Sequence, residues 1–413
     1  MRRNSFLAFG IIAVTVLLIE WYAYQALRTV TSNKLVHWIY FGFSAVVYLN
    51  MLYQFAAPSD ATVLDQPRSY AMGWFFATFF PKLIIIFFIF GEDIVRFVVG
   101  LFGKAGGDDF HLPGRRKFIS QIALGLAAVP FASLIYGMYK GKYRYRVVAH
   151  ELFFPDLPAG FDGYTITQIS DVHSGSFDNA KKINYGIDMI NAVGSDTIVF
   201  TGDLVNNLAS EMTPWKESFA RLRAPDGVYS ILGNHDYGTY YRGFENEAEA
   251  NQNFQDVCAC HGEMGWQLLR DEHVIKSRGG DQLAIVGVEN IGGGNFIKAG
   301  DLNKANEGLD PSIFRVLLSH DPSHFEDEVS EYPIKHQLTL SGHTHGMQFG
   351  IEIPGWIKWS PVQWRYPRWA GVYESNDRLL NVNRGFGFLA YPGRVGIWPE
   401  ITKITLRKGE RTA

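Results

Sequence analysis

Long uncharged segments near the N-terminus constrain this chain more than any other feature. Leu35–Ala57 is 23 residues long and Phe118–Tyr139 is 22 residues long, and neither contains Asp, Glu, Lys or Arg. An α-helix of this length spans the ~30 Å hydrocarbon core of a bilayer. Buried helices of a soluble protein are the alternative, but they are seldom so long and so apolar. The first 140 residues are therefore predicted to form a transmembrane region.

Two more apolar segments bring the predicted number of spans to about four. Phe6–Leu27 contains the single acidic residue Glu20. This segment also resembles an uncleaved signal sequence, and we interpret it as an anchor because it lacks a small-residue cleavage site. The other lies between Ala71 and Phe102, with unclear limits because Lys82 interrupts it. Either 72–90 or 83–102 is long enough to be its core.

Three charged residues lie at helical spacing in the second half of the segment between Ala71 and Phe102. They are Glu92, Asp93 and Arg96. They indicate either a polar site within the membrane or an interfacial helix after a span that ends at Gly91. We favour the interfacial helix, because the residues before Gly91 are sufficient to complete the crossing.

The orientation of the spans is weakly determined, because positive charges on the two sides of the predicted spans nearly balance. One local feature bears on it. Gly114–Ile119 contains Arg115-Arg116 directly before an apolar segment rich in Ala and Gly. This arrangement resembles a twin-arginine export signal, although it is internal. It predicts that the C-terminal part of the chain lies outside the cytoplasm. Alternatively, the two arginines are ordinary positively charged residues that flank a membrane span.

Composition excludes some other classes of protein. The formal net charge is −3, so no nucleic-acid partner is expected. The chain has only two cysteines, Cys258 and Cys260, separated by a single residue, which excludes a disulfide framework. Without a second cysteine pair, they are interpreted as ordinary residues of a helix rather than metal ligands.

Beyond the apolar region, strand-like and helix-like segments alternate. Period-two and apolar runs predict strands at 164–169, 197–200, 228–232, 282–288, 314–318, 338–340 and 378–382. Apolar residues at intervals of three and four predict a helix at 179–193, and a proline at the start of 214–222 suits another. The predicted organisation is a transmembrane region at 1–140, a connector at 141–160 and an α/β domain of layered sheets covered by helices at 161–413.

Candidate metal ligands follow the predicted strands of this domain. They lie in five segments: Asp171-Val-His173, Gly202-Asp203, Gly233-Asn234-His235-Asp236, His320 and Gly342-His343-Thr-His345. All offer oxygen or imidazole nitrogen and none offers a thiolate, which suits Mn²⁺, Zn²⁺ or Fe in hydrolytic chemistry. A two-metal site needs one shared anion, and Asp203 is the candidate.

The order and spacing of these five segments resemble the calcineurin-like metallophosphoesterase family, from about Phe161 to Leu406. The resemblance implies an α/β/β/α sandwich with two facing sheets and helices outside. It also implies two divalent ions. The ligands implied for the first ion are Asp171, His173, Asp203 and His345, and those for the second are Asp203, Asn234, His320 and His343.

The resemblance further implies roles in catalysis and substrate binding. His235 is expected to protonate the leaving group, with Asp236 orienting its imidazole. Asn234 is expected to contact substrate as well as metal. Arg384, in an Asn-Arg-Gly-Phe-Gly segment found in membrane-associated relatives, is a candidate for binding the substrate phosphate, with a surface turn as the alternative.

The expected function is that of a membrane-anchored dinuclear-metal phosphoesterase acting on a phosphate ester, phosphodiester or pyrophosphate. The resemblance is to a membrane-anchored bacterial branch that includes YkuE-like enzymes and hydrolases of UDP-2,3-diacylglucosamine. Membrane spans favour a lipid substrate, although anchoring alone would account for them. The alternatives are a non-catalytic metal-binding receptor or regulatory protein, and a transporter with a regulatory hydrolase domain. The intact ligand set argues against the receptor, and the scarcity of charges in the spans argues against the transporter.

Overall fold

The computed structural model describes residues 2–58, 64–103, 113–353 and 355–410. The chain divides into two compact units, the first formed by Met1–Pro58 and Tyr70–Tyr136, and the second mainly by Gly137–Ala413. We call them the helical unit and the catalytic unit, and describe each by itself.

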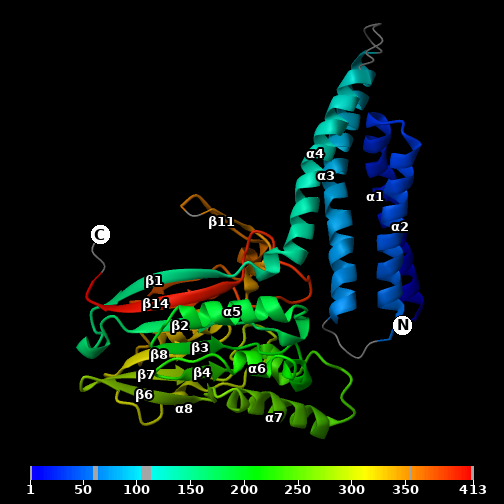
Figure 1. Ribbon diagram of the computed structural model, residues 1–413. Coiled ribbons are helices and arrows are strands. Elements are labelled where there is room, and N and C mark those ends of the chain that lie inside the picture. The colour runs from blue at the N-terminus through cyan, green and yellow to red at the C-terminus, as the bar shows by residue number, and fades with distance from the viewer. Residues whose placement is uncertain (1, 59–63, 104–112, 354, 411–413) are drawn as a thin grey trace. The chain divides into compact units, whose positions relative to one another are not determined.

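Four helices make up the helical unit. They are α1 (Arg2–Val30), α2 (Lys34–Ala56), α3 (Gln66–Gly103) and α4 (Pro113–Tyr139) (Figure 1). Their shared core is rich in alanine, contributed by α1 and α4, together with isoleucines of α3. Small side chains let helix backbones approach closely, which is how membrane helices associate when water supplies no driving force between them.

Three of these helices contain segments long and apolar enough to cross a membrane. The segments are Gly10–Val30, Lys34–Ala56 and Gly114–Tyr139. The prediction of apolar N-terminal helices is confirmed for these three. The fourth predicted span falls on α3, which is one helix of 38 residues containing Pro81 and Lys82. The shorter limits predicted for this segment cover only part of the helix.

A buried ion pair lies within the helical unit. Lys82 of α3 pairs with Glu20 of α1, and both side chains are almost fully buried. Ser44 and Tyr48 of α2 donate to the two carboxylate oxygens of Glu20 at 2.9 and 2.8 Å. The lysine also donates to Ser44 Oγ at 3.0 Å and lies 3.1 Å from the Tyr48 hydroxyl. Sequence reasoning, which saw few charges within the spans, missed this pairing.

The catalytic unit contains two six-stranded sheets. The first has the order β1-β14-β2-β3-β4-β5 and the second the order β12-β13-β9-β8-β7-β6. Strands of the first sheet are β1 (Arg146–Phe154), β2 (Thr165–Ile169), β3 (Thr197–Thr201), β4 (Val228–Ile231), β5 (Gln267–Leu268) and β14 (Glu400–Lys408). Strands of the second are β6 (Glu272–Arg278), β7 (Asp281–Gly287), β8 (Phe314–Leu318), β9 (Leu338–Ser341), β12 (Gly371–Ser375) and β13 (Arg378–Val382).

The two sheets face each other across a common core, and helices cover their outer faces. Alternate residues such as Ile166 and Val199 of the first sheet pack with Ile285 and Val316 of the second. The outer face of the first sheet is covered by α5 (Ala180–Ala192), α6 (Lys216–Phe219) and α7 (Glu247–Glu263). The second is covered by α8 (Leu302–Ala305) and α9 (Ser323–Asp327). The expected α/β/β/α sandwich is therefore confirmed (Figure 1).

The segment predicted to be a connector at 141–160 instead contains a strand. β1 pairs in parallel with β14 along its whole length, from Arg146 with Glu400 to Phe154 with Lys408. Leu152 and Phe154 point into the core between the sheets. The prolines at 155 and 158 suggested an irregular linker, but they follow the strand rather than interrupt it. Cys258 and Cys260 lie in α7 as free cysteines, as expected.

Candidate metal centre

The candidate ligands gather because parallel strands end at the same edge of each sheet. β2, β3 and β4 are parallel neighbours in the first sheet, and β8 and β9 are parallel neighbours in the second. Each of the five ligand segments follows the end of one of these strands. Loops at this edge are a common place for functional residues, because a rigid sheet holds them.

One group of ligands consists of Asp171, His173 and His345. Their ligand atoms lie within 4.8 Å of one another. The Nε2 atoms of the two histidines are 2.9 Å apart, and His345 Nε2 lies 3.3 Å from Asp171 Oδ1. All three side chains are buried, so these polar atoms face one another and not solvent.

A second group consists of Asp203, His320 and His343, with Asn234 beside them. The ligand atoms of the first three lie within 4.8 Å of one another. His343 Nδ1 is 2.9 Å from Asn234 Oδ1 and 3.3 Å from His320 Nε2. The neutral Oδ1 atom of Asn234 thus lies beside the point where His343 Nδ1 and His320 Nε2 converge.

Asp203 connects the two groups. Its Oδ2 atom lies 3.5 Å from His173 Nε2 in the first group and 3.2 Å from His320 Nε2 in the second. Its Oδ1 atom accepts the backbone N–H of His235 at 2.8 Å. One carboxylate therefore faces both groups, which is the geometry that a bridging ligand requires.

The electrostatics of the cluster suit cations. Burial lowers the pKa of His173 to about 3 and that of His343 to about 4, so both imidazoles are neutral and keep a lone pair for a metal. Burial disfavours charge on His320 too, but Asp203 outweighs it and raises the His320 pKa to about 10. Burial likewise opposes ionisation of Asp203, yet its histidine neighbours hold its pKa well below the usual value. Asp203 thus attracts positive charge to this position.

Hydrogen bonds hold the histidine rings in place. His320 Nδ1 lies 2.7 Å from the Thr201 carbonyl, which only accepts, so Nδ1 keeps its proton and Nε2 is the atom at which a metal would replace a proton. His343 Nε2 lies 2.8 Å from the Tyr366 hydroxyl, leaving Nδ1 toward Asn234. The seven residues therefore fit two divalent cations, by the chemistry of their donor atoms and by their convergence.

Strained backbone also marks this region. Among the described residues, eleven other than glycine have positive φ, and five of them are candidate ligands: Asp171, His173, Asp203, His343 and His345. Such conformations cost free energy and persist where the surroundings enforce them, often at functional sites. Gly202 has φ +94°, and a Cβ there would lie 2.6 Å from the Gly233 nitrogen and 2.7 Å from His320 Nδ1. Only glycine lets the β3 loop come this close to its neighbours.

The structure corrects the role expected for Asp236. Its carboxylate accepts four backbone N–H groups, those of Asp203, Leu204, Val205 and Gly233, at 2.7–3.2 Å. It therefore fastens the loop after β3 to the loop after β4. The His235 ring is oriented instead by Nδ1, which donates to the Asn206 carbonyl at 2.9 Å. Adjacency in sequence suggested the wrong partner, because the Asp236 side chain is directed to backbone amides.

Arg384 does not line the site either. Its guanidinium forms ion pairs with Glu352 and Glu400, and the side chain is buried. These two carboxylates neutralise the positive charge of Arg384 that was expected to bind a phosphate. The structure thus gives no support to substrate binding by Arg384, which stays a prediction.

A cavity of about 320 Å³ opens at the two ligand groups. Residues that sequence reasoning did not identify also line it: Phe296, Val362, Arg365, Tyr366 and Leu389. Val362, Arg365 and Tyr366 come from one segment and the other two from separate loops, and they share no motif that a local pattern could have found. Tyr240 lies beside the cavity, with its ring centroid 4.5 Å from that of His235. Tyr237 instead donates to Glu289, away from the cavity.

Comparison with known proteins agrees with this geometry. Residues 164–347 match the family described as "Calcineurin-like phosphoesterase". Residues 2–142 match the family described as "Probable Calcineurin-like phosphoesterase, transmembrane domain". The chain belongs to the calcineurin-like metallophosphoesterase family. It is thus a membrane-associated, metal-dependent hydrolase with a transmembrane region and a catalytic domain.

Relatives of this metallophosphoesterase occur in bacteria and animals. It is 29% identical to the uncharacterized metallophosphoesterase YkuE of Bacillus subtilis, over 71% of this chain and 97% of that protein. It is 25% identical to a Danio rerio transmembrane protein with a metallophosphoesterase domain, over 79% of this chain and 71% of that protein. It is 28% identical to the UDP-2,3-diacylglucosamine pyrophosphatase LpxG of Chlamydia trachomatis, over 63% of this chain and 89% of that protein.

Proposed function

We propose that this phosphoesterase uses two divalent ions to hydrolyse a phosphodiester or pyrophosphate bond of a lipid-linked substrate. The observation that carries the proposal is the position of Asp203 between two ligand groups. The first ion would be held by Asp171, His173, Asp203 and His345, and the second by Asp203, Asn234, His320 and His343. When bound, such ions lower the pKa of a coordinated water and stabilise negative charge on phosphoryl oxygens.

His235 has the position of a general acid in this scheme. Its Nδ1–H is committed to the Asn206 carbonyl, which leaves Nε2 available at the cavity it lines. When protonated, Nε2 would donate to the oxygen of the leaving group. A non-catalytic receptor would have no need for a histidine held in this way.

Substrate contacts follow from the rest of the cavity wall. Arg365 is exposed, lines the cavity, and forms no ion pair within the described part of the chain. We propose that it binds a substrate phosphate, the role first expected of Arg384. Phe296, Val362 and Leu389 supply an apolar wall beside it. Charge next to apolar surface suits a phosphorylated lipid, and the relative LpxG is named as a pyrophosphatase of such a substrate, UDP-2,3-diacylglucosamine.

Metal analysis and turnover test the proposal together. Full-length protein loaded with Mn²⁺ or Zn²⁺ should retain two ions per chain, since one bridging carboxylate joins two ligand groups. It should hydrolyse a member of a panel of phosphodiesters, nucleotide pyrophosphates and lipid phosphates. Removal of the ions by a chelator should abolish turnover, and re-addition should restore it. A stoichiometry of one ion or fewer would exclude the two-metal site, and two bound ions without hydrolysis across the panel would favour the receptor.

We also propose that the catalytic unit lies outside the cytoplasm. The support is the segment Gly114–Ile119, whose paired arginines precede the apolar part of α4. Arg116 also pairs with Glu92, at 3.1 Å, and with Asp93, both on α3. Arg116 therefore also joins α4 to α3.

A further inference from the structure

The hairpin formed by β10 (Ile351–Ile353) and β11 (Ile357–Trp359) has an apolar face on which the β10 residues are exposed and the β11 residues are half-buried. The two strands pair only with each other, as a separate two-stranded sheet. Ile351 lies opposite Trp359, and Ile353 lies opposite Ile357, so one face carries only apolar side chains. Ile351 is 50% exposed and Ile353 is 43% exposed. A hairpin on a water-soluble surface normally has the opposite arrangement.

The two polar residues of the hairpin both contact the body of the catalytic unit, Glu352 as a half-buried side chain and Lys358 as an exposed one. Glu352 lies opposite Lys358 in the pairing. Glu352 forms an ion pair with the buried Arg384, and Lys358 donates to the Ala370 carbonyl. Both polar side chains are thus tied to the body of the catalytic unit. These contacts fix the orientation of the hairpin and leave its apolar face without a covering element in the described part of this unit.

Neighbouring residues extend the apolar face. Trp356 in the turn is 77% exposed and Trp364, which follows the hairpin, is 78% exposed. Met347 and Phe349, which precede it, are 58% and 41% exposed. Figure 1 shows the hairpin projecting from the catalytic unit beside the label β11. Several large apolar side chains exposed within one short segment of the chain indicate an interaction site.

The apolar surface adjoins the metal cavity along the chain. His345, a candidate ligand, begins the short 3₁₀ turn His345–Gln348 that leads into β10. The turn Pro361–Trp364 follows β11 and contributes Val362 to the cavity wall, and Arg365 comes next. The chain therefore runs from a metal ligand, out through the hairpin, and back to the cavity wall.

We propose that the surface formed by Met347, Phe349, Ile351, Ile353, Trp356 and Trp364 docks into the interface of a lipid bilayer. The bilayer is the occupant we choose because the same chain carries helices able to cross one, and α4 ends at Tyr139, only a short connector before β1 at Arg146. Tryptophan is enriched at membrane interfaces, where its apolar ring and its N–H both find partners. Lys358 and Arg365 add positive charge near the surface, which suits anionic headgroups.

Docking has a consequence for the substrate. A lipid-linked phosphate could pass from the bilayer along the apolar surface to the cavity without exposing its chains to water. This consequence rests on the proposed function, whereas docking itself does not. The two are therefore tested by different measurements.

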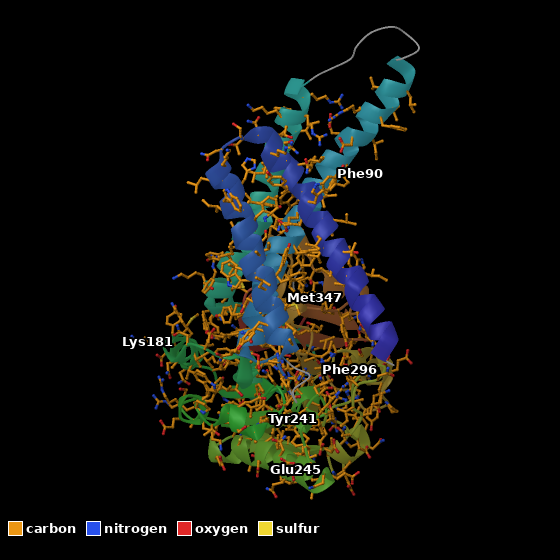
Figure 2. All side chains as sticks on the ribbon, turned by 90° about the vertical axis from the view of Figure 1, so that its right-hand side faces the viewer. Phe90, Lys181, Tyr241, Glu245, Phe296 and Met347 are labelled. Carbon is orange, nitrogen blue, oxygen red and sulfur yellow. The ribbon has the colours of Figure 1, made fainter. Side chains whose placement is uncertain are left out.

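Docking is tested with a fluorescent probe on the full-length protein. Trp356→Cys is made after both native cysteines are changed to Ala, and the new thiol carries an environment-sensitive fluorophore. The control is Glu247→Cys, at the exposed start of α7. In Figure 2 the neighbouring Glu245 lies at the far end of the catalytic unit from Met347. The protein is reconstituted in vesicles of phosphatidylcholine and phosphatidylglycerol, with and without spin-labelled lipid.

We expect the probe at 356 to shift to the blue and to be quenched by spin-labelled lipid, while the probe at 247 does neither. A probe at 356 that behaves like the one at 247 would show that the hairpin faces water. A blue shift without quenching by lipid would show that protein covers the surface, either another copy or the chain's own helices. Either result would overturn the proposal.

Activity then tests the consequence for substrate delivery. Trp356→Ser should lower the ratio of hydrolysis of a bilayer-embedded substrate to that of a soluble phosphodiester by about tenfold or more, because interfacial binding is lost. Tyr185→Ser, which removes an exposed aromatic ring from α5, should leave that ratio unchanged. An unchanged ratio in Trp356→Ser would contradict delivery through this surface. Wild-type protein that hydrolyses neither substrate would instead contradict the proposed function, with the docking result still standing.

Discussion

The backbone N–H of His235 donates to the carboxylate of Asp203, yet the two side chains have separate tasks. The carboxylate of Asp203 faces both ligand groups, whereas the ring of His235 is turned to the Asn206 carbonyl and the cavity. Removing the first deletes a shared anion. Removing the second deletes only a proton donor.

The two substitutions are expected to differ in metal content. Asp203→Ala should lose paired metal and activity together. His235→Ala should keep two ions while turnover falls ~10²–10⁴-fold, the usual contribution of a general acid. Metal analysis and rate measurement on the same preparations distinguish them, with Lys181→Ala as a control at the exposed start of α5 (Figure 2). Loss of metal from His235→Ala equal to that from Asp203→Ala would show that the assigned roles are wrong.

Arg365 and Arg384 show how burial decides the role of a charged residue. Arg384 belongs to the more suggestive sequence segment but is held by two carboxylates. Arg365 belongs to no motif but lines the cavity. An arginine already bound to internal carboxylates would have to break those pairs to bind phosphate, whereas Arg365 would not.

Among the elements, α1 and α3 are joined by the ion pair between Glu20 and Lys82, and α2 is joined to them by hydrogen bonds to this pair. Every donor of the lysine and both oxygens of the glutamate have partners, including Ser44 and Tyr48 of α2. A buried charge that loses its partner is strongly unfavourable, while replacing both charges by apolar groups is often tolerated. The pair therefore specifies which helix faces meet.

Single and double substitutions should separate these effects. Glu20→Ala should destabilise the helical unit by roughly 3–5 kcal/mol, because Lys82 is left buried and unpaired. The double variant Glu20→Leu with Lys82→Met should be markedly more stable than Glu20→Ala. Thermal unfolding in detergent measures both, with Glu263→Ala as a control that removes an exposed ion pair to Lys216. Equal stability of the single and double variants would argue against an uncompensated charge as the cause.

For the whole molecule, the side of the membrane on which the catalytic unit lies determines which substrates it meets. A cysteine at position 247, with both native cysteines changed to Ala, should react with a membrane-impermeant thiol reagent in intact cells if the unit is exported. Labelling only after lysis would place the metal site in the cytoplasm. It would also direct the substrate search to lipids of the inner leaflet and nucleotide-linked precursors.

Much of the catalytic architecture could be predicted because its determinants are local. Period-two apolar runs predicted strands such as β8 and β13 with their observed bounds. Ligands directly after strands could be recognised because short segments such as Gly202-Asp203 combine a tight turn with a donor side chain. The strand β1 was missed because its partner, β14, lies more than two hundred residues away in the chain. Pairing, and not its own sequence, makes that segment part of the sheet.

The sequence by itself determined the candidate metal ligands, the α/β alternation and the apolar helices, since each depends on short-range spacing. Only the tertiary structure decided that Asp236 holds backbone amides, that Arg365 and not Arg384 reaches the cavity, and that Glu20 meets Lys82. The direction in which the β10–β11 hairpin presents its apolar side chains was decided in the same way. The physical reason is common to all of them. A polar or apolar side chain takes its role from the partners that surround it, and those partners come from distant parts of the chain.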